Sequence, residues 1–435
     1  METKLTLIAK KAKEDRTCRF NNLMHLIDIG SLRECFYRLK RKKAPGIDLV
    51  TMEEYESNLE ANLEDLMERM KCMSYRPQPT RRVYIPKAGG KKRALGIPTV
   101  EDKVVQMAFT RILEAIYEGD FLGHSYGFRK GRSAHQALAR VDQRIMNEPI
   151  NVVLDADIKG FFDNVDQQWM KRFLEERISD RKFIRYILRM LKSGVMEEGV
   201  FRPTGKGTPQ GGVVSPMLAN IYLHYALDLW FHHRVRKQIK GYADLIRYCD
   251  DFIILVEEEA EAREILKWLE ERLAKFGLEL AETKTGVVRC GRKAWDEHDK
   301  GGPKPGTFNF LGFTHYCGRS RKGHFKVGRR TEKKRFGRSM QNMKNWLRRN
   351  RNALPLRELH GQISVMLLGH YRYYGVSDNS RRLQCFYHEA RRYYYKWLNR
   401  RSQVRSFTWE SFDKYLSRHP LPQPRIYNDL YRIAF

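Results

Sequence analysis

The sequence predicts an α+β fold with more than one hydrophobic core, on two observations. Apolar residues recur at helical spacing over long stretches, and between these stretches lie short β-branched or alternating segments typical of strands. Of the 435 residues, 42% are hydrophobic. This supplies enough apolar material for a large core and excludes a disordered basic chain.

Composition also limits where the protein works. No apolar run approaches the roughly 18 to 20 residues of a membrane span, so we expect no membrane contact. The seven cysteines are scattered, and none forms a C-x-x-C pair. We therefore predict neither a zinc site nor a disulfide framework, and we expect reduced thiols in a cytoplasmic protein.

The first third of the chain predicts helices and one hairpin. Helical spacing covers the first 43 residues and returns from Tyr55 to Met70. Residues 82–98 alternate like two strands around a glycine-rich loop. Thr99, with Asp102 three residues on, predicts a capping box that begins the next helix.

Two later strand-like segments end in acids. The β-branched run 152–158 carries Asp155 and Asp157, and segment 247–256 predicts a tight hairpin with Asp250 and Asp251 at its tip. Between the two segments, Ser215 is the predicted N-cap and Pro216 the first-turn proline of a long helix. A further amphipathic helix is expected from about residue 258 to 276, ending at Gly277.

Buried acids need a partner, because desolvation raises their pKa or costs several kcal/mol. An Asp-Asp pair alone indicates little, since most such pairs lie in solvated turns. If the two acid-ended strands are neighbours, however, three carboxylates converge, and Mg²⁺ is the cation that oxygen ligands of this kind favour. Two such ions, about 3.5 to 4 Å apart, promote in-line phosphoryl transfer.

The positive charge is concentrated near the carboxyl end. The formal net charge is +30, and Arg319–Arg405 contains 24 Lys or Arg against 4 Asp or Glu. A field of this size attracts a polyanion and predicts salt-sensitive binding of nucleic acid. The aromatic residues interleaved here could stack on bases, but we expect most of them to pack a helical core.

Several segments, in chain order, resemble the motifs of the group II intron-encoded reverse transcriptases and maturases. Residues 248–252, Tyr-Cys-Asp-Asp-Phe, look like the Y-x-D-D motif of reverse transcriptases. The other matching segments are 44–48, 85–99, 124–129, 157–163, 207–216, 282–285 and 310–313, with 368–374 and 397–401 resembling the family's basic thumb or maturase region. The resemblance covers roughly residues 15–430.

By position, the resemblance implies a metal site formed by Asp157, Asp250 and Asp251, with Asp250 the primary ligand of the pair. Ile158, directly after Asp157, is assigned to the same site. Two Mg²⁺ ions are the implied cofactors. Asp155 is a rival acid, to which we assign a structural role because the family's ligand precedes the isoleucine.

The same resemblance implies the nucleotide site. Lys87 and Arg93 match the residues that grip the triphosphate of the incoming dNTP, and Gln210 matches the residue beside nucleotide and template. Phe162 matches the aromatic gate that rejects a 2′-hydroxyl, although core packing is the alternative, because only one of Phe161 and Phe162 can face the site.

The remaining assignments are supporting ones. Asp163 is a second rival acid with an expected structural role, and Lys284 is expected to support the primer or the floor of the site. His124 and His135 are expected to be structural. Cys249 stands where alanine is usual, and no Cys/His cluster follows residue 385, so the zinc-supported HNH endonuclease domain of some relatives is not expected.

The fold implied is a right-hand polymerase with an antiparallel palm sheet. We expect an N-terminal extension (1–43), fingers and palm (44–317), a basic helical thumb or maturase domain (318–405) and a C-terminal segment (406–435). The expected function is RNA-directed DNA synthesis from a DNA or RNA primer on an RNA template, with help to splicing and mobility of a structured intron RNA.

Two alternatives stay open at this point. The protein could be a maturase that acts mainly as a non-catalytic splicing factor, or a free-standing reverse transcriptase used in phage defence or DNA repair. An RNA-dependent RNA polymerase is disfavoured by Phe162. The oligomeric state is not predicted.

Overall fold

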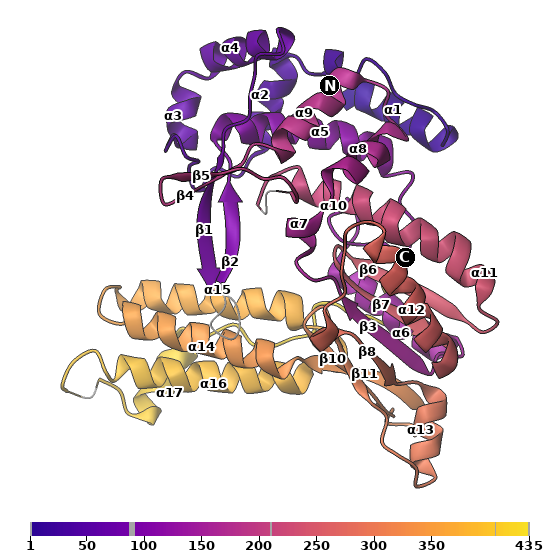
Figure 1. The fold of residues 1–435 in the computed structure, drawn as a ribbon. Coiled ribbons are helices and arrows are strands. Elements are labelled where there is room, and N and C mark those ends of the chain that lie inside the picture. The colour runs from indigo at the N-terminus through magenta and orange to yellow at the C-terminus, as the bar shows by residue number, and fades with distance from the viewer. Residues whose placement is uncertain (1, 87–91, 209–210, 405, 434–435) are drawn as a thin grey trace.

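The computed structural model describes residues 2–86, 92–208, 211–404 and 406–433, and has an α+β fold with antiparallel sheets (Figure 1). Helices gather at the amino-terminal end, a four-stranded sheet lies in the middle, and a helical bundle forms the carboxyl-terminal part. Among the described residues, no helix combines the length and the apolar character that crossing a membrane requires.

The amino-terminal part consists of helices and a small sheet of order β2-β1-β4-β5. Its helices are α1 (Glu2–Glu14), η1 (Met24–Leu26), α2 (Ile29–Arg38), α3 (Met52–Ser57), α4 (Leu59–Lys71), α5 (Val100–Tyr117), α8 (Gln167–Glu175) and α9 (Arg181–Leu191). Its strands are β1 (Thr80–Pro86), β2 (Lys92–Ile97), β4 (Val195–Glu197) and β5 (Val200–Arg202).

The expected hairpin is confirmed, since β1 and β2 pair antiparallel from Arg81↔Ile97 to Pro86↔Lys92. The capping box that begins α5 is only half present. Thr99 accepts a hydrogen bond from the Asp102 N–H, but the Asp102 carboxylate turns away to Tyr75 Oη and Gln78 N. Asp102 is buried and therefore needs these partners.

The central sheet has the order β6-β7-β3-β8, with every neighbouring pair antiparallel. Its strands are β3 (Val152–Asp157), β6 (Ala243–Tyr248), β7 (Asp251–Val256) and β8 (Gly286–Arg289). The helices in this part of the chain are α6 (Ala134–Asn147), α7 (Phe161–Asn164), α10 (Ser215–Leu223), η3 (His224–Asp228), η4 (Phe231–Val235), α11 (Arg236–Gln238), α12 (Glu259–Ala274), η5 (Glu282–Lys284) and α13 (Arg292–Asp299).

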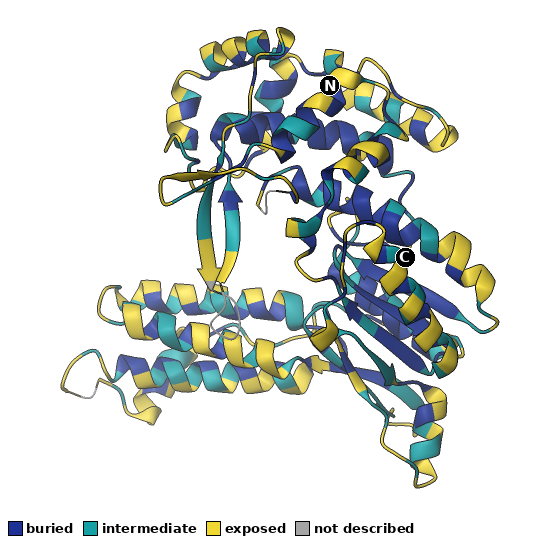
Figure 2. Ribbon diagram, in the orientation of Figure 1, coloured by how far each residue is buried: buried dark blue, intermediate teal, exposed yellow. Residues whose placement is uncertain are grey.

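Both faces of this sheet are covered, which explains why its inner strand β7 is almost continuously apolar (Figure 2). Leu154 and Ile254 belong to the large core shared with the amino-terminal helices. Val153 and Leu255, on the opposite face, belong to a second core. That core includes residues of α6 and of a three-stranded sheet formed by β9 (Thr307–Phe310), β10 (Phe313–Arg319) and β11 (Phe325–Thr331).

The carboxyl-terminal part is a bundle with its own core. Its helices are α14 (Lys333–Asn350), α15 (Leu356–Tyr374), α16 (Ser380–Leu398) and α17 (Trp409–Arg418). Tyr371, Tyr394 and Trp397 are buried in this core, so here aromatic residues pack the bundle, as expected. The expected boundary after residue 317 falls inside β10, and the helices begin only at Lys333.

Candidate active site

Strand register brings two of the three predicted metal ligands together. In the antiparallel pair β3–β7, Asp157 lies directly opposite Asp251. Neighbouring strands are about 4.8 Å apart, and side chains alternate between faces, so Asp155, Asp157 and Asp251 share one face of the sheet. Asp250 belongs to the turn between β6 and β7, directly before Asp251.

Crowding of these acids changes their proton affinity. Burial first, and then the charges of Asp155, Asp250 and Asp157, raises the pKa of Asp251 to about 7. Arg335 at the start of α14 opposes this shift. Burial and the neighbouring Asp157 likewise raise the pKa of Asp155 to about 6. The site therefore carries more negative charge than its surroundings neutralise.

The donor set fits a hard divalent cation, because the converging groups are carboxylate oxygens. Asp157 already attracts one cation, since its carboxylate forms an ion pair with Lys284 of η5. Within the described part of the chain, however, no three acidic, histidine or cysteine side chains are close enough together to hold one ion. The metal assignment thus stays a prediction, with a substrate phosphate as the expected source of further oxygens.

Ile158 fits the site through its main chain. Its side chain is buried, and it forms an antiparallel bridge with Leu280. The two hydrogen bonds of this bridge use the flanking groups, namely the Asp157 carbonyl with Ala281 N and the Lys159 N–H with Glu279 O. The bridge therefore does not use the Ile158 carbonyl, which is a candidate oxygen ligand.

The two phenylalanines of α7 have different surroundings. Phe161 is 2% exposed and lies in the core, whereas Phe162 is half-buried and lines a cavity of about 230 Å³. Of the two, Phe162 is thus the residue that can face a substrate. Gly207 packs its α-carbon against the Phe162 carbonyl with φ +86°, so a side chain at 207 would collide with the backbone there.

The cavity also contains polar groups that the sequence analysis did not single out. Arg82 Nε and Thr208 Oγ1 are buried, and neither has a hydrogen-bond partner among the described residues. Both side chains line the cavity, together with Lys206. A buried polar atom without a partner is costly, so these atoms are candidate contacts for a polar ligand.

The other predicted residues stand as follows. Arg93 is exposed on β2, opposite Ile85, while Lys87 and Gln210 lie outside the described residues. Asp163 is exposed on α7. His124 lies beside the buried carboxylate of Asp228, and His135 contacts the Tyr373 carbonyl, so both histidines have structural partners.

Comparison with known proteins identifies the family. A family profile described as reverse transcriptase (RNA-dependent DNA polymerase) matches residues 85–315, more than half of the chain. The chain is also 31% identical over 356 residues to protein YkfC of Escherichia coli (strain K12), across 74% of this chain and 89% of that protein. The chain belongs to the group II intron-encoded reverse transcriptase and maturase family.

Further relatives fit this assignment. The group II intron-encoded protein LtrA of Lactococcus lactis subsp. cremoris is 32% identical over 296 residues, which cover 54% of this chain and 49% of LtrA. Nuclear intron maturase 4, mitochondrial, of Arabidopsis thaliana is 32% identical over 140 residues, or 30% of this chain and 16% of that protein. The protein is thus an RNA-directed DNA polymerase, and it spans about half the length of LtrA.

Proposed function

We propose that this reverse transcriptase extends a primer on an RNA template with dNTPs, using two Mg²⁺ ions held by Asp157, Asp250 and Asp251. The observation that carries the proposal is the register of β3 and β7, which sets Asp157 opposite Asp251 with Asp250 adjacent. In this arrangement the central sheet is the palm, the amino-terminal helices with β1 and β2 are the fingers, and the basic bundle is the thumb.

The proposed division of the chain is the one expected from the sequence: an extension (1–43), fingers and palm (44–317), thumb (318–405) and a C-terminal segment. Its support is that separate cores underlie the palm and the helical bundle. We also propose that the protein works in the cytoplasm, a placement supported by cysteines that are all free among the described residues.

Each part of the site has a role in the proposed reaction. Bound Mg²⁺ ions supply charge that activates the primer hydroxyl and stabilises the leaving oxygen. Asp157, Asp250 and Asp251 would hold these ions. Phe162 excludes the 2′-hydroxyl of a ribonucleotide, and Lys87 and Arg93 grip the triphosphate. Gln210, outside the described residues, is the proposed contact for nucleotide and template.

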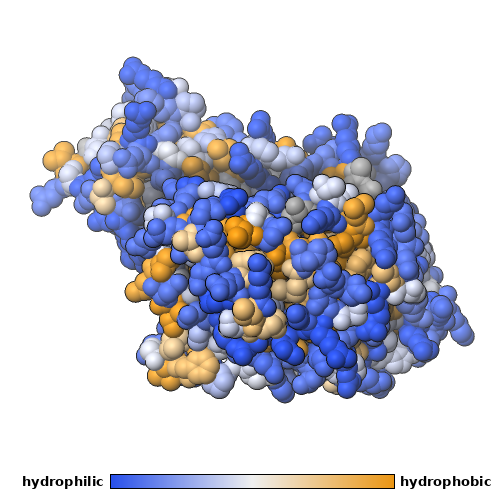
Figure 3. Space-filling model, turned by 90° about the horizontal axis from the view of Figure 1, so that it is seen from above, coloured by the Kyte–Doolittle hydropathy of each residue, from blue (hydrophilic) through white to orange (hydrophobic). Residues whose placement is uncertain are grey.

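Intron RNA is the proposed physiological partner. The support is that two relatives are named as an intron-encoded protein and an intron maturase. A second support is the positive charge of the thumb, where α14 exposes Lys333, Lys334 and Arg338. Seen from above, the surface is largely hydrophilic, with scattered apolar residues (Figure 3).

A purely non-catalytic maturase is less well supported, because the acids of a polymerase site are present and adjacent. Splicing that survives Asp250→Ala would separate the two activities.

Primer extension tests the proposal. Wild type should extend a primer on RNA in the presence of magnesium and prefer dNTPs to rNTPs. Asp250→Ala should abolish extension while RNA binding is retained, because the basic surfaces are unchanged. Asp296→Ala, which removes an exposed acid of α13, is the matched control and should behave like wild type. Extension near the wild-type rate by Asp250→Ala would contradict the assignment.

A further inference from the structure

The turn that carries the catalytic aspartates has an unfavourable backbone conformation. Strand β6 ends at Tyr248 and β7 begins at Asp251, so Cys249 and Asp250 alone connect them. Cys249 has φ +60°, in the left-handed region that residues with a side chain rarely adopt. Such a conformation persists only where the surrounding structure holds it in place.

One neighbour of the turn is the segment from His124 to Gly127. It adds to the edge of β6 through two hydrogen bonds, from Arg247 N to His124 O at 2.9 Å and from Tyr126 N to Arg247 O at 2.9 Å. A Cβ atom at Gly127 would lie 2.4 Å from Cys249 N. The segment is therefore in backbone contact with the turn. This close contact requires glycine at position 127.

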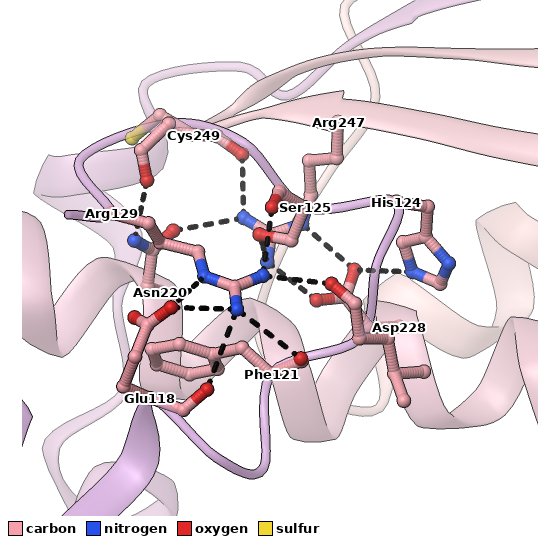
Figure 4. A network of polar contacts seen from close by, with 11 residues as sticks. Glu118, Phe121, His124, Ser125, Arg129, Asn220, Asp228, Arg247 and Cys249 are labelled. Atoms are coloured by element: carbon pink, nitrogen blue, oxygen red, sulfur yellow. Dashed lines mark hydrogen bonds and ion pairs between the residues drawn. The ribbon is translucent and has the colours of Figure 1, made fainter. Parts of the chain in front are cut away.

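The side chain of Arg247 connects the turn to the helices beneath it (Figure 4). It is fully buried, and each of its five N–H groups has an acceptor. Nη1 donates to the Cys249 carbonyl at 3.0 Å and to Asn220 Oδ1 at 3.1 Å. Nη2 donates to Ser125 Oγ at 2.8 Å, and Nε and Nη2 both donate to the carboxylate of Asp228.

The acceptors of Arg247 are themselves held in place. Asn220 on α10 donates from its amide to the Gly127 carbonyl at 2.7 Å, which joins α10 to the segment that contacts the turn. Asp228 ends the π-helical segment η3 and is fully buried. Burial would raise the pKa of Asp228, but the charge of Arg247 and contacts with His124 hold it below its ordinary value. Asp228 thus stays charged and holds the guanidinium.

We propose that Arg247 is a positioning residue, whose bond to the Cys249 carbonyl fixes the turn and with it the carboxylates of Asp250 and Asp251. This proposal rests on the proposed function of the two aspartates. The Cys249 carbonyl belongs to the peptide group that leads directly into Asp250, so a displaced carbonyl displaces the metal ligand. A lysine could keep the ion pair with Asp228 but lacks the planar fork that reaches the other three acceptors.

Arg247→Lys tests the proposal with two readouts. The kcat for primer extension should fall about 10- to 100-fold with little change in KM for dNTP, because a misplacement of about 1 Å costs this much. The Mg²⁺ concentration for half-maximal rate should rise. Independently of activity, Cys249, which is 3% exposed, should become reactive to a maleimide in the metal-free protein.

Two controls separate positioning from general stability. Cys35, a residue of α2, is 0% exposed and should stay unreactive in the same peptide map. Arg329→Lys removes the fork of another fully buried arginine, which binds Asp142 and Asp378, and should change neither the labelling of Cys249 nor the Mg²⁺ dependence. If wild type itself fails to extend primers, the proposed function fails, but the labelling still tests whether Arg247 holds the turn.

Ser125→Ala is a milder variant, because it removes one acceptor and leaves the ion pair. The same two readouts should move in the same direction by a smaller factor. Unchanged kcat and unchanged Cys249 labelling in both variants would overturn the proposal. Equal labelling of Cys35 and Cys249 in Arg247→Lys would also overturn it, because it would show that Arg247 supports the whole fold and not the turn.

Discussion

At the scale of single residues, the pKa of Asp251 gives a test that needs no substrate. Because this pKa is raised to about 7 in the folded state, the native protein binds more protons than the unfolded chain between about pH 4 and pH 7. Metal-free stability should therefore fall as pH rises through this window. At pH 8, Asp251→Asn should be more stable than wild type by up to about 4 kcal/mol.

Thermal unfolding from pH 5 to pH 8, with and without Mg²⁺, measures this effect. Mg²⁺ should stabilise wild type more than Asp251→Asn at pH 8, since the ion compensates the crowded charges. A stability difference between the two proteins that does not change with pH would contradict the shifted pKa.

Selection between dNTPs and rNTPs is a second property that we expect to depend on one side chain, that of Phe162. Phe162→Ala opens the wall of the cavity, so discrimination against rNTPs should weaken by about tenfold or more. The ratio of kcat/KM for dNTP and rNTP measures it. Phe161→Leu is the control, because Phe161 is a core residue, and it should alter stability without altering sugar choice. Equal effects of the two substitutions on sugar choice would rule out a specific gate at Phe162.

At the scale of elements, the contact of Gly127 with the β6–β7 turn leaves no room for a side chain. Gly127→Ala places a methyl group against Cys249 N, so we expect a loss of about 1 to 3 kcal/mol in stability together with a strong loss of extension. Gly123→Ala, one residue before this segment, has no atom within 4 Å of the added Cβ and should behave like wild type. Chemical denaturation measures the stability of both variants, and primer extension measures their activity.

Sequence patterns predict several strands of this protein but not the side-chain network around Arg247. Period-two and β-branched patterns predict β1, β2, β3 and β7, and these four strands form as expected. Such patterns involve only residues that are neighbours in the sequence, so they can be recognised without the fold. The network around Arg247 could not be predicted in the same way. Its acceptors come from residues 125, 220, 228 and 249, which only the fold brings together. The available sequence signal was Arg247 itself, a charged residue that directly follows Leu245 and Ile246 in the strand segment 243–248.

Helix beginnings show a second limit. Ser215 was predicted to cap α10, but Val214 holds the N-cap position without a side-chain bond, and Ser215 lies within the first turn. Asp102 likewise does not complete the expected capping box, because its carboxylate accepts a hydrogen bond from Tyr75 Oη. In both cases the tertiary environment selects between helix beginnings of similar free energy. The spacing of residues in the sequence does not show which beginning is favoured.

At the scale of the whole molecule, charge dominates the expected behaviour. RNA affinity should fall linearly in a plot of log K against log salt concentration, with a slope of about 0.7 to 0.9 per neutralised phosphate contact. Lys333→Gln and Lys334→Gln on α14 should each reduce this slope if the thumb contacts RNA. Lys414→Gln, whose amine already pairs with Glu410, is the control. Slopes that do not change in the α14 variants would place the RNA elsewhere.

The central claim is that Asp157, Asp250 and Asp251 hold a pair of divalent ions, and counting bound ions tests it most directly. The titration uses Mn²⁺, followed by electron paramagnetic resonance, on wild type with a primer–template and a non-hydrolysable dNTP. We predict two ions per protein above those bound by the nucleic acid and nucleotide alone, and none for a variant with all three aspartates changed to asparagine. Two ions bound by that variant as well would contradict the assignment of the three aspartates as metal ligands.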